Sequence, residues 1–416
     1  MDRATRNIEF RIYPTIGQER SLFGWLDLHR ELYNAALQER RDAYQKCGIS
    51  LSYNQQQNQL PEVKRVRPEL TPLGSHALQE TVRRVDRAYK AFFRRVKAGD
   101  KPGFPRFKGK HRFDSFTYPD PAGWKILEQD SGKGRLRIGN MGTIKMRGKP
   151  RVALSKGEPR TLTVRHKNGK WYAVVAVRYE ADCLSRNRGY HDRQIGLDAG
   201  CKDLVFTSDQ DNIANPKNLA CAQRKLKKAQ KELSRKKRGS KNRNKTRDKV
   251  ARIHQKVANR RKDFLHQLSA CVVFLYAFIA IEKLQLKNMT RSSRGTMSNP
   301  GKNVKQKAGL NRSMLDASIG LFFSMLAYKA EEAGSQLEKV PPNGTTQICA
   351  RCGKTVPKKL SVRIHDCPHC GFVAHRDYNA ALNILLLGLS QAGREPSEVW
   401  RGWAFAPAKH ETASIR

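Results

Sequence analysis

The stretch Ile195-Gly-Leu-Asp-Ala-Gly200 ends a short apolar run in a charged acid, Asp198. Two other segments have the same character: Phe278-Ile-Ala-Ile-Glu282, and His375-Arg-Asp-Tyr-Asn-Ala-Ala381, in which Asp377 precedes an apolar helical pattern. A charged group at the tip of a buried strand is costly unless something binds it. Acids from distant parts of a chain assemble the metal sites of two-metal phosphodiesterases. The pattern therefore predicts a metal-dependent nuclease site.

The order of Asp198, Glu282 and Asp377 fits the RNase H-like plan, in which the first acid lies on the first strand of a mixed sheet. The second acid lies at the end of a later strand, and the third at the start of a late helix. Each acid also has an ordinary explanation, as a turn former, a strand-end residue or a helix N-cap. Their joint placement carries the prediction that they hold two Mg²⁺ ions.

Two Cys-x2-Cys pairs, separated by fourteen residues, stand between the second and third acids: Cys349, Cys352, Cys367 and Cys370. This spacing is typical of a zinc ribbon, and four thiolates satisfy tetrahedral Zn²⁺ completely. The sequence therefore predicts one structural zinc ion in preference to a redox dithiol. We expect the neighbouring histidines to be ordinary surface residues: His365, His369 and His375.

The chain of 416 residues has a formal net charge of +44 and a pI near 10.3. Self-repulsion of that size destabilises a compact state, so a polyanion is expected to be part of the working particle. A membrane role is not expected, because the longest apolar run, Ala270–Ile281, is too short to span a bilayer and no signal peptide pattern is present. Nine cysteines without a secretion signal favour a reducing cytosol over a disulfide framework.

The N-terminal half mixes strand and helix patterns. Alternation predicts a strand at Ile8–Pro14, and apolar spacing predicts helices from Gly17 to about Gln45 and from His76 to Phe93. From Leu136 to Tyr179 the pattern changes to strands, and Asn168-Gly169 is a preferred two-residue hairpin turn. The sequence predicts a small β-barrel interrupted by helices, with these bounds: barrel 1–15 and 120–188, helices 16–119.

The segment Lys101–Lys110 contains too much proline and glycine to form regular structure. Its side chains combine stacking surface with positive charge, which is typical of a nucleic-acid contact. The candidate contact residues are Phe104, Arg106 and Lys108. An equally good interpretation is a basic linker whose phenylalanines dock on the helices.

In the C-terminal half, Gln194–Asp198 and Asp203–Ser208 predict a hairpin that carries the first acid. Two helices follow, at about Asn218–Lys237 and Thr246–Val273, and about half of the residues between Arg224 and Lys262 are Lys or Arg. Charges of one sign at helical spacing repel without counterions, so a helical pair that lies on nucleic acid is favoured over a solvated face. We assign this pair to 217–270 and expect nucleic-acid contacts from three of its residues: Lys236, Lys237 and Arg238.

The remaining segments complete an α/β pattern. We expect a strand at Phe278–Leu284, a mobile loop at Arg291–Gln306, one amphipathic helix at Leu310–Gly334 and a strand at Gln336–Val340. The polar segment Gln391–Arg416 has no periodicity and is expected to be disordered.

Five segments form a set that is specific in combination: Ile195-Gly-Leu-Asp-Ala-Gly-Cys-Lys-Asp203, Ile281-Glu-Lys-Leu284 with Asn288-Met289, Leu310-Asn-Arg-Ser-Met-Leu-Asp316, Thr346-Gln-Ile-Cys-Ala-Arg-Cys-Gly353, and Arg376-Asp-Tyr-Asn-Ala-Ala-Leu-Asn-Ile384. They resemble the TnpB family, the RNA-guided nucleases that insertion sequences encode. The resemblance extends from Phe10 to about Leu387.

The resemblance implies an α+β multidomain fold, with a wedge β-barrel interrupted by a helical recognition lobe. A RuvC-like nuclease domain, RNase H-like in fold, would follow at 189–340 and 374–390, with a zinc ribbon at 341–373. It implies a guide RNA from the transposon end, a double-stranded DNA target and a short adjacent motif. The three acids fall on the family's catalytic positions, where two Mg²⁺ ions, or Mn²⁺ in their place, would bind. A prokaryotic protein of the cytoplasm or nucleoid is expected, and no protein partner is indicated.

Three residues resemble the family's motif-reading positions: Tyr53, Gln79 and Thr117. A core role is the alternative for Tyr53. The chain departs from the family at His375, where many members have an acid, and at Ala199 and Cys201, where bulkier aliphatic residues are common. The last two departures touch packing, and His375 is not at a metal-ligand position of the motif.

Other interpretations stay open on sequence alone. A compact type V CRISPR effector, which takes its guide from an array, would have nearly the same features. A non-cleaving RNA-guided DNA-binding protein or transposition regulator would have lost one or more acids, and this chain keeps all three. A strand-transferring transposase with the same fold is disfavoured by the recognition lobe and the zinc ribbon.

Overall fold

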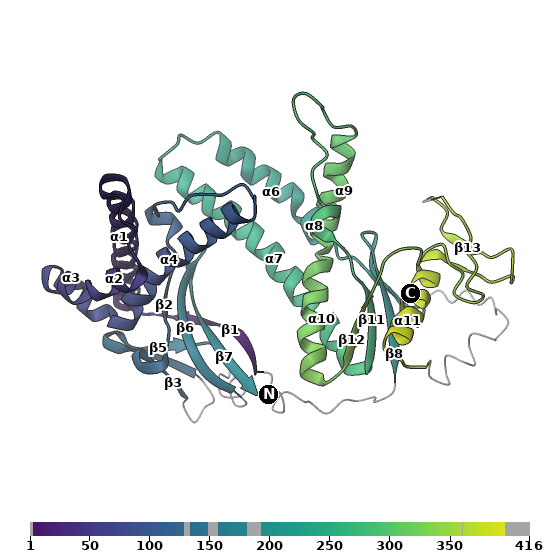
Figure 1. The fold of residues 1–416 in the computed structure, drawn as a ribbon, viewed down its shortest axis with the longest axis horizontal. Coiled ribbons are helices and arrows are strands. Elements are labelled where there is room, and N and C mark those ends of the chain that lie inside the picture. Colours follow the sequence, from purple (N-terminus) through teal and green to yellow (C-terminus); the bar gives the residue numbers. More distant parts are fainter. Residues whose placement is uncertain (1–2, 129–133, 149–156, 181–192, 360, 396–416) are drawn as a thin grey trace. The chain divides into compact units, whose positions relative to one another are not determined.

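Two structural units, Met1–Cys183 and Leu184–Arg416, make up the computed structural model of the protein (Figure 1). The structure describes residues 3–128, 134–148, 157–180, 193–359 and 361–395. Most of the segment predicted to be a disordered tail lies outside these ranges, from residue 396 onward, and Gln391 is the last residue of a helix. No helix in the described ranges is long and apolar enough to cross a membrane.

The first unit is built on a seven-stranded antiparallel sheet with the order β2-β6-β7-β1-β5-β4-β3. Its strands have these bounds: β1 Arg3–Tyr13, β2 Ser115–Tyr118, β3 Trp124–Glu128, β4 Gly134–Ile138, β5 Gly142–Met146, β6 Gly157–Lys167 and β7 Lys170–Glu180. Asn168 and Gly169 have positive φ angles of 51° and 74°. This is the geometry of the predicted two-residue turn, which is confirmed.

Helices fill the chain between β1 and β2: α1 Ile16–Cys47, α2 Tyr53–Asn58, α3 Leu60–Val66 and α4 Ser75–Lys97. At the start of α1, the side chains of Thr15 and Gln18 bond each other's backbone N–H groups. His29 of α1 joins the helices to the sheet: its Nδ1 is 2.7 Å from Thr81 Oγ1 of α4, and its ring stacks on Phe116 of β2. The two predicted helices are confirmed. Strand β2 lies in the range that we assigned to helices.

The second unit is built on a mixed five-stranded sheet with the order β10-β9-β8-β11-β12. Its strands have these bounds: β8 Gln194–Ala199, β9 Asp203–Thr207, β10 Asn212–Ala214, β11 Phe278–Glu282 and β12 Gln336–Val340. The pairs β8–β11 and β11–β12 are parallel, whereas β8–β9 and β9–β10 are antiparallel. This is the mixed sheet that an RNase H-like fold requires.

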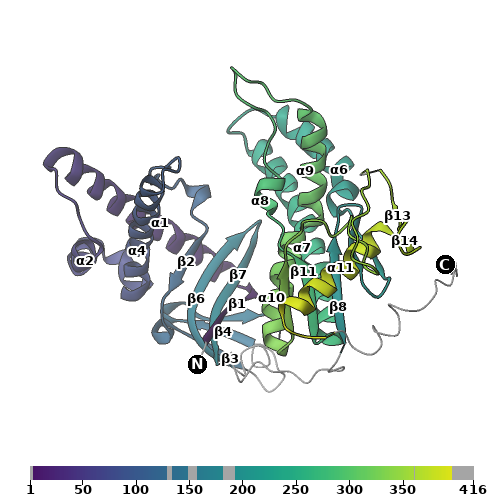
Figure 2. The same ribbon diagram turned by 45° about the vertical axis from the view of Figure 1, so that its right-hand side comes forward.

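Neighbouring residues of β11 point to opposite faces of the sheet and meet different helices. Ile279 and Ile281 join a core to which α7 Lys241–Leu275 and α10 Ile319–Ala333 contribute. Phe278 and Ala280 pack against α11 Arg376–Gln391. Figures 1 and 2 show α11 on the side of the sheet opposite to α10.

The single helix predicted at Leu310–Gly334 is wrong, because two helices occupy this stretch. Helix α9 Val304–Ala317 ends before Ser318, whose φ of 55° is left-handed, and α10 begins directly after it. The apolar spacing continues through this break, so periodicity alone does not reveal it. The other elements of this unit are α6 Asn218–Ser234, α8 Leu286–Met289, β13 Ile364–Asp366 and β14 Val373–His375.

Candidate functional site

Asp198 and Glu282 lie beside each other at one end of the second unit's sheet. Strands β8 and β11 run parallel, and their pairing ends with Leu197 opposite Ile281. Asp198 and Glu282 are the next residues on the two strands. Both carboxylates therefore belong to the carboxyl ends of neighbouring parallel strands, where open α/β sheets bind ligands.

Helix α11 brings Asp377 to the same end of the sheet. His375 is the N-cap of α11, and its Nδ1 accepts a hydrogen bond from the backbone N of Asp377 at 3.3 Å. The His375 ring also stacks on Phe206, with centroids 5.1 Å apart, and Phe206 is the register partner of Asp198. The structure thus gathers the three acids that the sequence singles out. We predicted His375 to be an ordinary surface histidine, but its ring also caps α11 and stacks on Phe206.

Two glycines let α11 lie close to the strands that carry Asp198 and Glu282. A Cβ atom on Gly196 of β8 would collide with the carbonyl oxygen of Ala381 of α11. A Cβ atom on Gly388 of α11 would lie 2.7 Å from Cβ of Ala280 on β11. Any side chain at either position would push the helix away from the sheet, and Asp377 would move with it.

Burial and mutual repulsion change the ionisation of these acids. Burial, followed by the negative charges of Glu282 and Asp377, raises the pKa of Asp198 to about 7, while Arg376 acts against this rise. Burial also raises the pKa of Glu282, and a hydrogen bond from Thr345 opposes it. Arg376 pairs with Asp377 at 3.1 Å. A buried cluster of like charges needs counter-charge, and carboxylate oxygens are ligands of Mg²⁺, so the residues fit a divalent-metal site.

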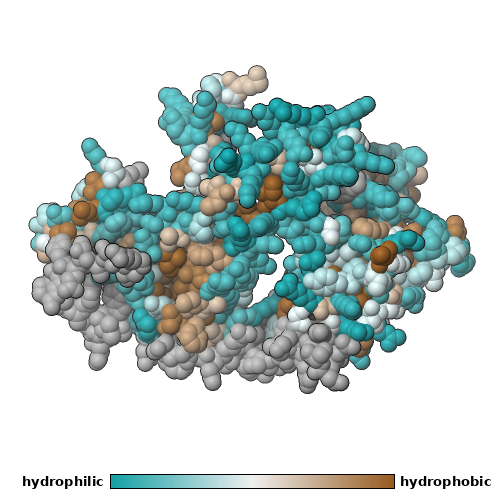
Figure 3. All heavy atoms as spheres, turned by 180° about the vertical axis from the view of Figure 1, so that it is seen from behind, coloured by the Kyte–Doolittle hydropathy of each residue, from teal (hydrophilic) through white to brown (hydrophobic). Residues whose placement is uncertain are grey.

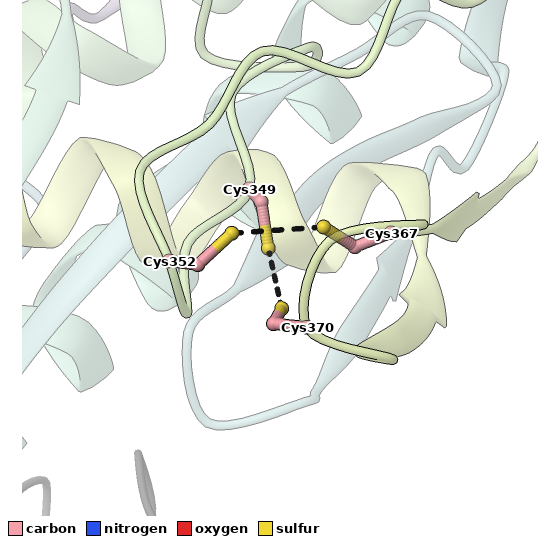
Figure 4. Close-up of side chains that lie close together, drawn as sticks. All are labelled: Cys349, Cys352, Cys367 and Cys370. Atoms are coloured by element: carbon pink, nitrogen blue, oxygen red, sulfur yellow. Dashed lines mark hydrogen bonds between the residues drawn. The ribbon is translucent and has the colours of Figure 1, made fainter.

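The four cysteines of the two Cys-x2-Cys pairs converge on one point (Figure 4). Their Sγ atoms all lie within 4.8 Å of one another, and the Cys349–Cys370 and Cys352–Cys367 separations are both 3.6 Å. Among the described residues, this is the only group of three or more metal-binding side chains at that spacing. Four thiolates that converge in this way fit the tetrahedral coordination of Zn²⁺.

The prediction that His365 is a surface residue is wrong. The side chain is fully buried, with its ring 5.9 Å from that of Phe372, and its Nδ1 contacts Lys358 Nζ. His365 lies on β13, where its side chain points into the ribbon while its neighbours Ile364 and Asp366 are exposed. His369 is exposed, as predicted.

The three candidate motif-reading residues lie around helix α4 of the first unit. The hydroxyl of Tyr53 accepts a hydrogen bond from Arg83 at 3.0 Å, and the Arg83 guanidinium lies 4.8 Å from the centre of the ring. Thr117 accepts from Arg84 at 2.8 Å. Gln79 is one helical turn before Arg83 and is partly exposed. Their role in reading DNA stays a prediction.

The basic segment around Phe104 is held against the helices of the first unit. The side chain of Asn34 of α1 accepts from the backbone N of Lys108 at 2.8 Å and donates to its carbonyl at 3.0 Å. The Phe104 ring meets Phe92 edge-on, with centroids 5.3 Å apart, and stays 46% exposed. These contacts support the docked-linker interpretation, and Arg106 is exposed. Nucleic-acid contact by this segment stays a prediction.

We call α6, α7 and the turn 235–240 between them the basic hairpin. Lys236, Lys237 and Arg238 lie in this turn rather than on a helix. Lys and Arg side chains are exposed along both helices, and Figure 3 shows a mostly hydrophilic surface there. The hairpin therefore presents a surface of dense positive charge, and its contact with nucleic acid stays a prediction.

Asp316 of α9 joins the basic hairpin to the rest of the second unit. Its carboxylate accepts from the backbone N of Leu219 at 3.0 Å and from Arg261 Nη2 at 2.7 Å. Helix α6 has no capping side chain of its own, so Asp316 supplies the cap from elsewhere in the chain. The sequence analysis did not identify this role.

Three family models match the chain. Residues 175–293 match the IS605 OrfB model, described as "Probable transposase". Residues 320–384 match "Cas12f1-like, TNB domain", and residues 1–48 match the "Helix-turn-helix domain" of IS605 OrfB. In this structure the last segment forms β1 and α1.

Two relatives match almost the whole chain. "Putative RNA-guided DNA endonuclease InsQ" of Escherichia coli K12 is 33% identical over 94% of this chain and 97% of its own. "Putative RNA-guided DNA endonuclease" of Streptomyces pristinaespiralis is 30% identical over 100% of this chain and 99% of its own. Among solved structures, a Cas12f1–sgRNA–target DNA complex has a TM-score of 0.58 at 13% identity, covering 92% of this chain and 98% of that one.

The mixed sheet, the gathered acids and the four-cysteine ribbon define a protein with a RuvC-like nuclease fold, which the Cas12f1 likeness supports. The two relatives that match nearly the whole chain then identify its family. The chain belongs to the IS605 OrfB family, whose members are called TnpB proteins.

Proposed function

We propose that this protein is a guide-RNA-directed DNA endonuclease that cleaves guide-matched DNA beside a short transposon-adjacent motif. The observation that carries the proposal is the gathering of Asp198, Glu282 and Asp377 at the carboxyl ends of β8 and β11. It is supported by two bacterial relatives named as RNA-guided DNA endonucleases. We propose the bacterial cytoplasm or nucleoid as the place of action, since guide and target meet there.

In this proposal the three acids hold two Mg²⁺ ions, or Mn²⁺ in their place. When bound, the ions would supply activation of water and stabilisation of the leaving oxygen. The protein's own contribution is to fix the ligands. Helix α11 sets Asp377, two strands set Asp198 and Glu282, and Arg376 neutralises part of the cluster's charge. We further propose one structural Zn²⁺ on the four cysteines.

Different surfaces of the protein would bind the nucleic-acid backbones and read the adjacent motif. The basic hairpin and the segment around Arg106 would hold the guide RNA and target backbone through charge. Tyr53, Gln79 and Thr117 would read the adjacent motif, while base pairing reads the rest. Residues 1–15 and 120–188 would form the wedge together with strand β2, and the rest of 16–119 the recognition lobe. Residues 189–340 with 374–390 would form the RuvC domain and 341–373 the zinc ribbon.

A plasmid library tests this function, with a guide-matched target placed beside a randomised flank. We expect cleavage to select one short flank, to require the guide and Mg²⁺ or Mn²⁺, and to stop in EDTA. RNA that co-purifies with the protein should include one abundant structured species. Guided binding without cleavage at any flank would favour a regulator instead, and equal binding of RNA-free protein to all duplexes would exclude guided recognition.

Replacing Asp316 by alanine is expected to loosen the basic hairpin, because Arg261 and the first turn of α6 lose their shared partner. Breaking a buried ion pair costs about 3–5 kcal/mol, which corresponds to several degrees in the melting temperature of this unit. Amide exchange over 218–234 should accelerate, and guide RNA affinity should fall. Asp263→Ala, which removes an exposed acid of α7, is the control. Unchanged exchange in α6 would contradict the capping role.

A further inference from the structure

The side chain of Thr345 makes a hydrogen bond to one of the three acids. Its Oγ1 donates to Glu282 Oε1 at 2.8 Å, and the carbonyl of Pro342, at 3.5 Å, is a weaker alternative acceptor. Thr345 is 2% exposed and Glu282 8% exposed, so water competes little for this bond. Thr345 lies in the loop that leads from β12 into the first cysteine pair.

Two asparagines of α11 hold the loop that contains Thr345. Asn383 Nδ2 donates to the carbonyl of Thr345 at 2.8 Å and to that of Ile348 at 2.7 Å. Asn379 Nδ2 donates to the same Ile348 carbonyl at 2.7 Å, and its Oδ1 accepts from the backbone N of Ala350 at 3.0 Å. The asparagines are four positions apart and therefore lie on one face of the helix.

These bonds replace the ones that regular secondary structure would supply. The loop at 345–350 belongs to neither a helix nor a strand, so its buried backbone groups need partners from elsewhere. Cys349 lies inside this loop, so the same contacts fix the first cysteine of the ribbon. Helix α11 thus carries Asp377 and also holds the loop that reaches Glu282.

We propose that Thr345 is a positioning residue, which holds the Glu282 carboxylate in the orientation that binds a divalent metal. The two asparagines of α11 keep Thr345 in place for this. The inference rests on the proposed function, in which Glu282 is a metal ligand. The last torsion of a glutamate side chain is broad, so without this bond the carboxylate would sample several orientations. Hydrogen bonds to metal ligands typically change metal affinity or activity by about 10–100-fold.

The test compares Thr345→Ser with Thr345→Ala, which both lose the methyl group but differ in the hydroxyl. The probe is Mn²⁺, measured by electron paramagnetic resonance on the guide-RNA complex, with Asp198→Ala as the blank for binding elsewhere. The Mn²⁺ concentration for half-saturation should rise about tenfold or more in the alanine protein and stay within about twofold of wild type in the serine protein. Cleavage by the alanine protein should recover as Mn²⁺ is raised, with zinc content unchanged.

Equal Mn²⁺ affinities of the serine and alanine proteins would overturn the proposal. Loss of zinc or of folding in the alanine protein alone would also overturn it, because the hydroxyl would then serve the loop rather than Glu282. Thr345→Val keeps the volume without the hydroxyl, and wild-type Mn²⁺ affinity in that protein is a third contradicting result. If wild-type protein cleaves nothing while Mn²⁺ binding still depends on the hydroxyl, the positioning role stands and the nuclease function fails.

Discussion

Asp198→Asn is expected to abolish cleavage of guide-matched DNA, by about 10⁴-fold or more, while guided DNA binding stays near wild type. Binding comes from base pairing and from phosphate contacts, whereas the acid serves the metal. The same change should stabilise the protein in EDTA. Because the pKa of Asp198 is raised to about 7, its ionisation costs stability as the pH rises from about 4 to 7. Asparagine removes that cost.

The measurements are a cleavage time course, a guided-binding assay and melting curves at several pH values. Asp211→Asn, at an exposed acid in the turn between β9 and β10, is the matched control and should change neither cleavage nor the pH profile. Glu282→Gln and Asp377→Asn should each cost nearly as much activity as the triple change, since the acids act as one unit. Residual cleavage near wild type in Asp377→Asn would move the third metal ligand to another residue.

Cys367→Ser is expected to remove the bound zinc and to unfold the ribbon at 341–373. Zinc binding to an all-thiolate structural site stabilises the folded state directly. In comparable small sites the free energy of zinc binding is about 10 kcal/mol or more. Cleavage should also fall, because the ribbon's first cysteine lies in the loop that reaches Glu282. Zinc per chain is measured by mass spectrometry, and ribbon folding by limited proteolysis.

Cys271→Ser is the control for this change, because that thiol is exposed on α7 and belongs to no metal-binding group among the described residues. It should keep full zinc content and full activity. Zinc that is unaffected by Cys367→Ser, or wild-type protein without zinc, would contradict the assignment of the four cysteines.

Local patterns predicted the fold well where one short segment decides the structure. The Asn168-Gly169 turn and the hairpin after Gln194 depend only on neighbouring residues, and both are confirmed. The break at Ser318 could not be predicted this way. The nearest glycine, Gly320, lies two residues beyond Ser318 rather than at the break, and the apolar spacing of the two helices continues across it. The left-handed region is uncommon for residues other than glycine, so a serine gives no local sign that the helix ends there.

The sequence predicted the three acids of the candidate site, but not the uncharged residues that hold them in place. Acids at the ends of apolar runs stand out in any sequence, because their burial needs a compensating ligand. Thr345 is an uncharged residue in a loop, and its partner lies far away in the chain. The only sign of Asn379 and Asn383 in the sequence is that they are polar residues, four positions apart, in an otherwise apolar helical pattern. What they bond could be found only from the folded chain.

The junction at Asp316 sets a rule for shortening this protein. Many residues of the basic hairpin are exposed, so it is a segment that a shortened variant would omit. Excising 224–262 would remove Arg261 and leave a buried carboxylate with fewer partners. A workable truncation would retain Arg261 and the first turn of α6, or would replace Asp316 by an uncharged residue in the same step. Asp316, which lies outside the basic hairpin, therefore determines how much of the hairpin can be removed.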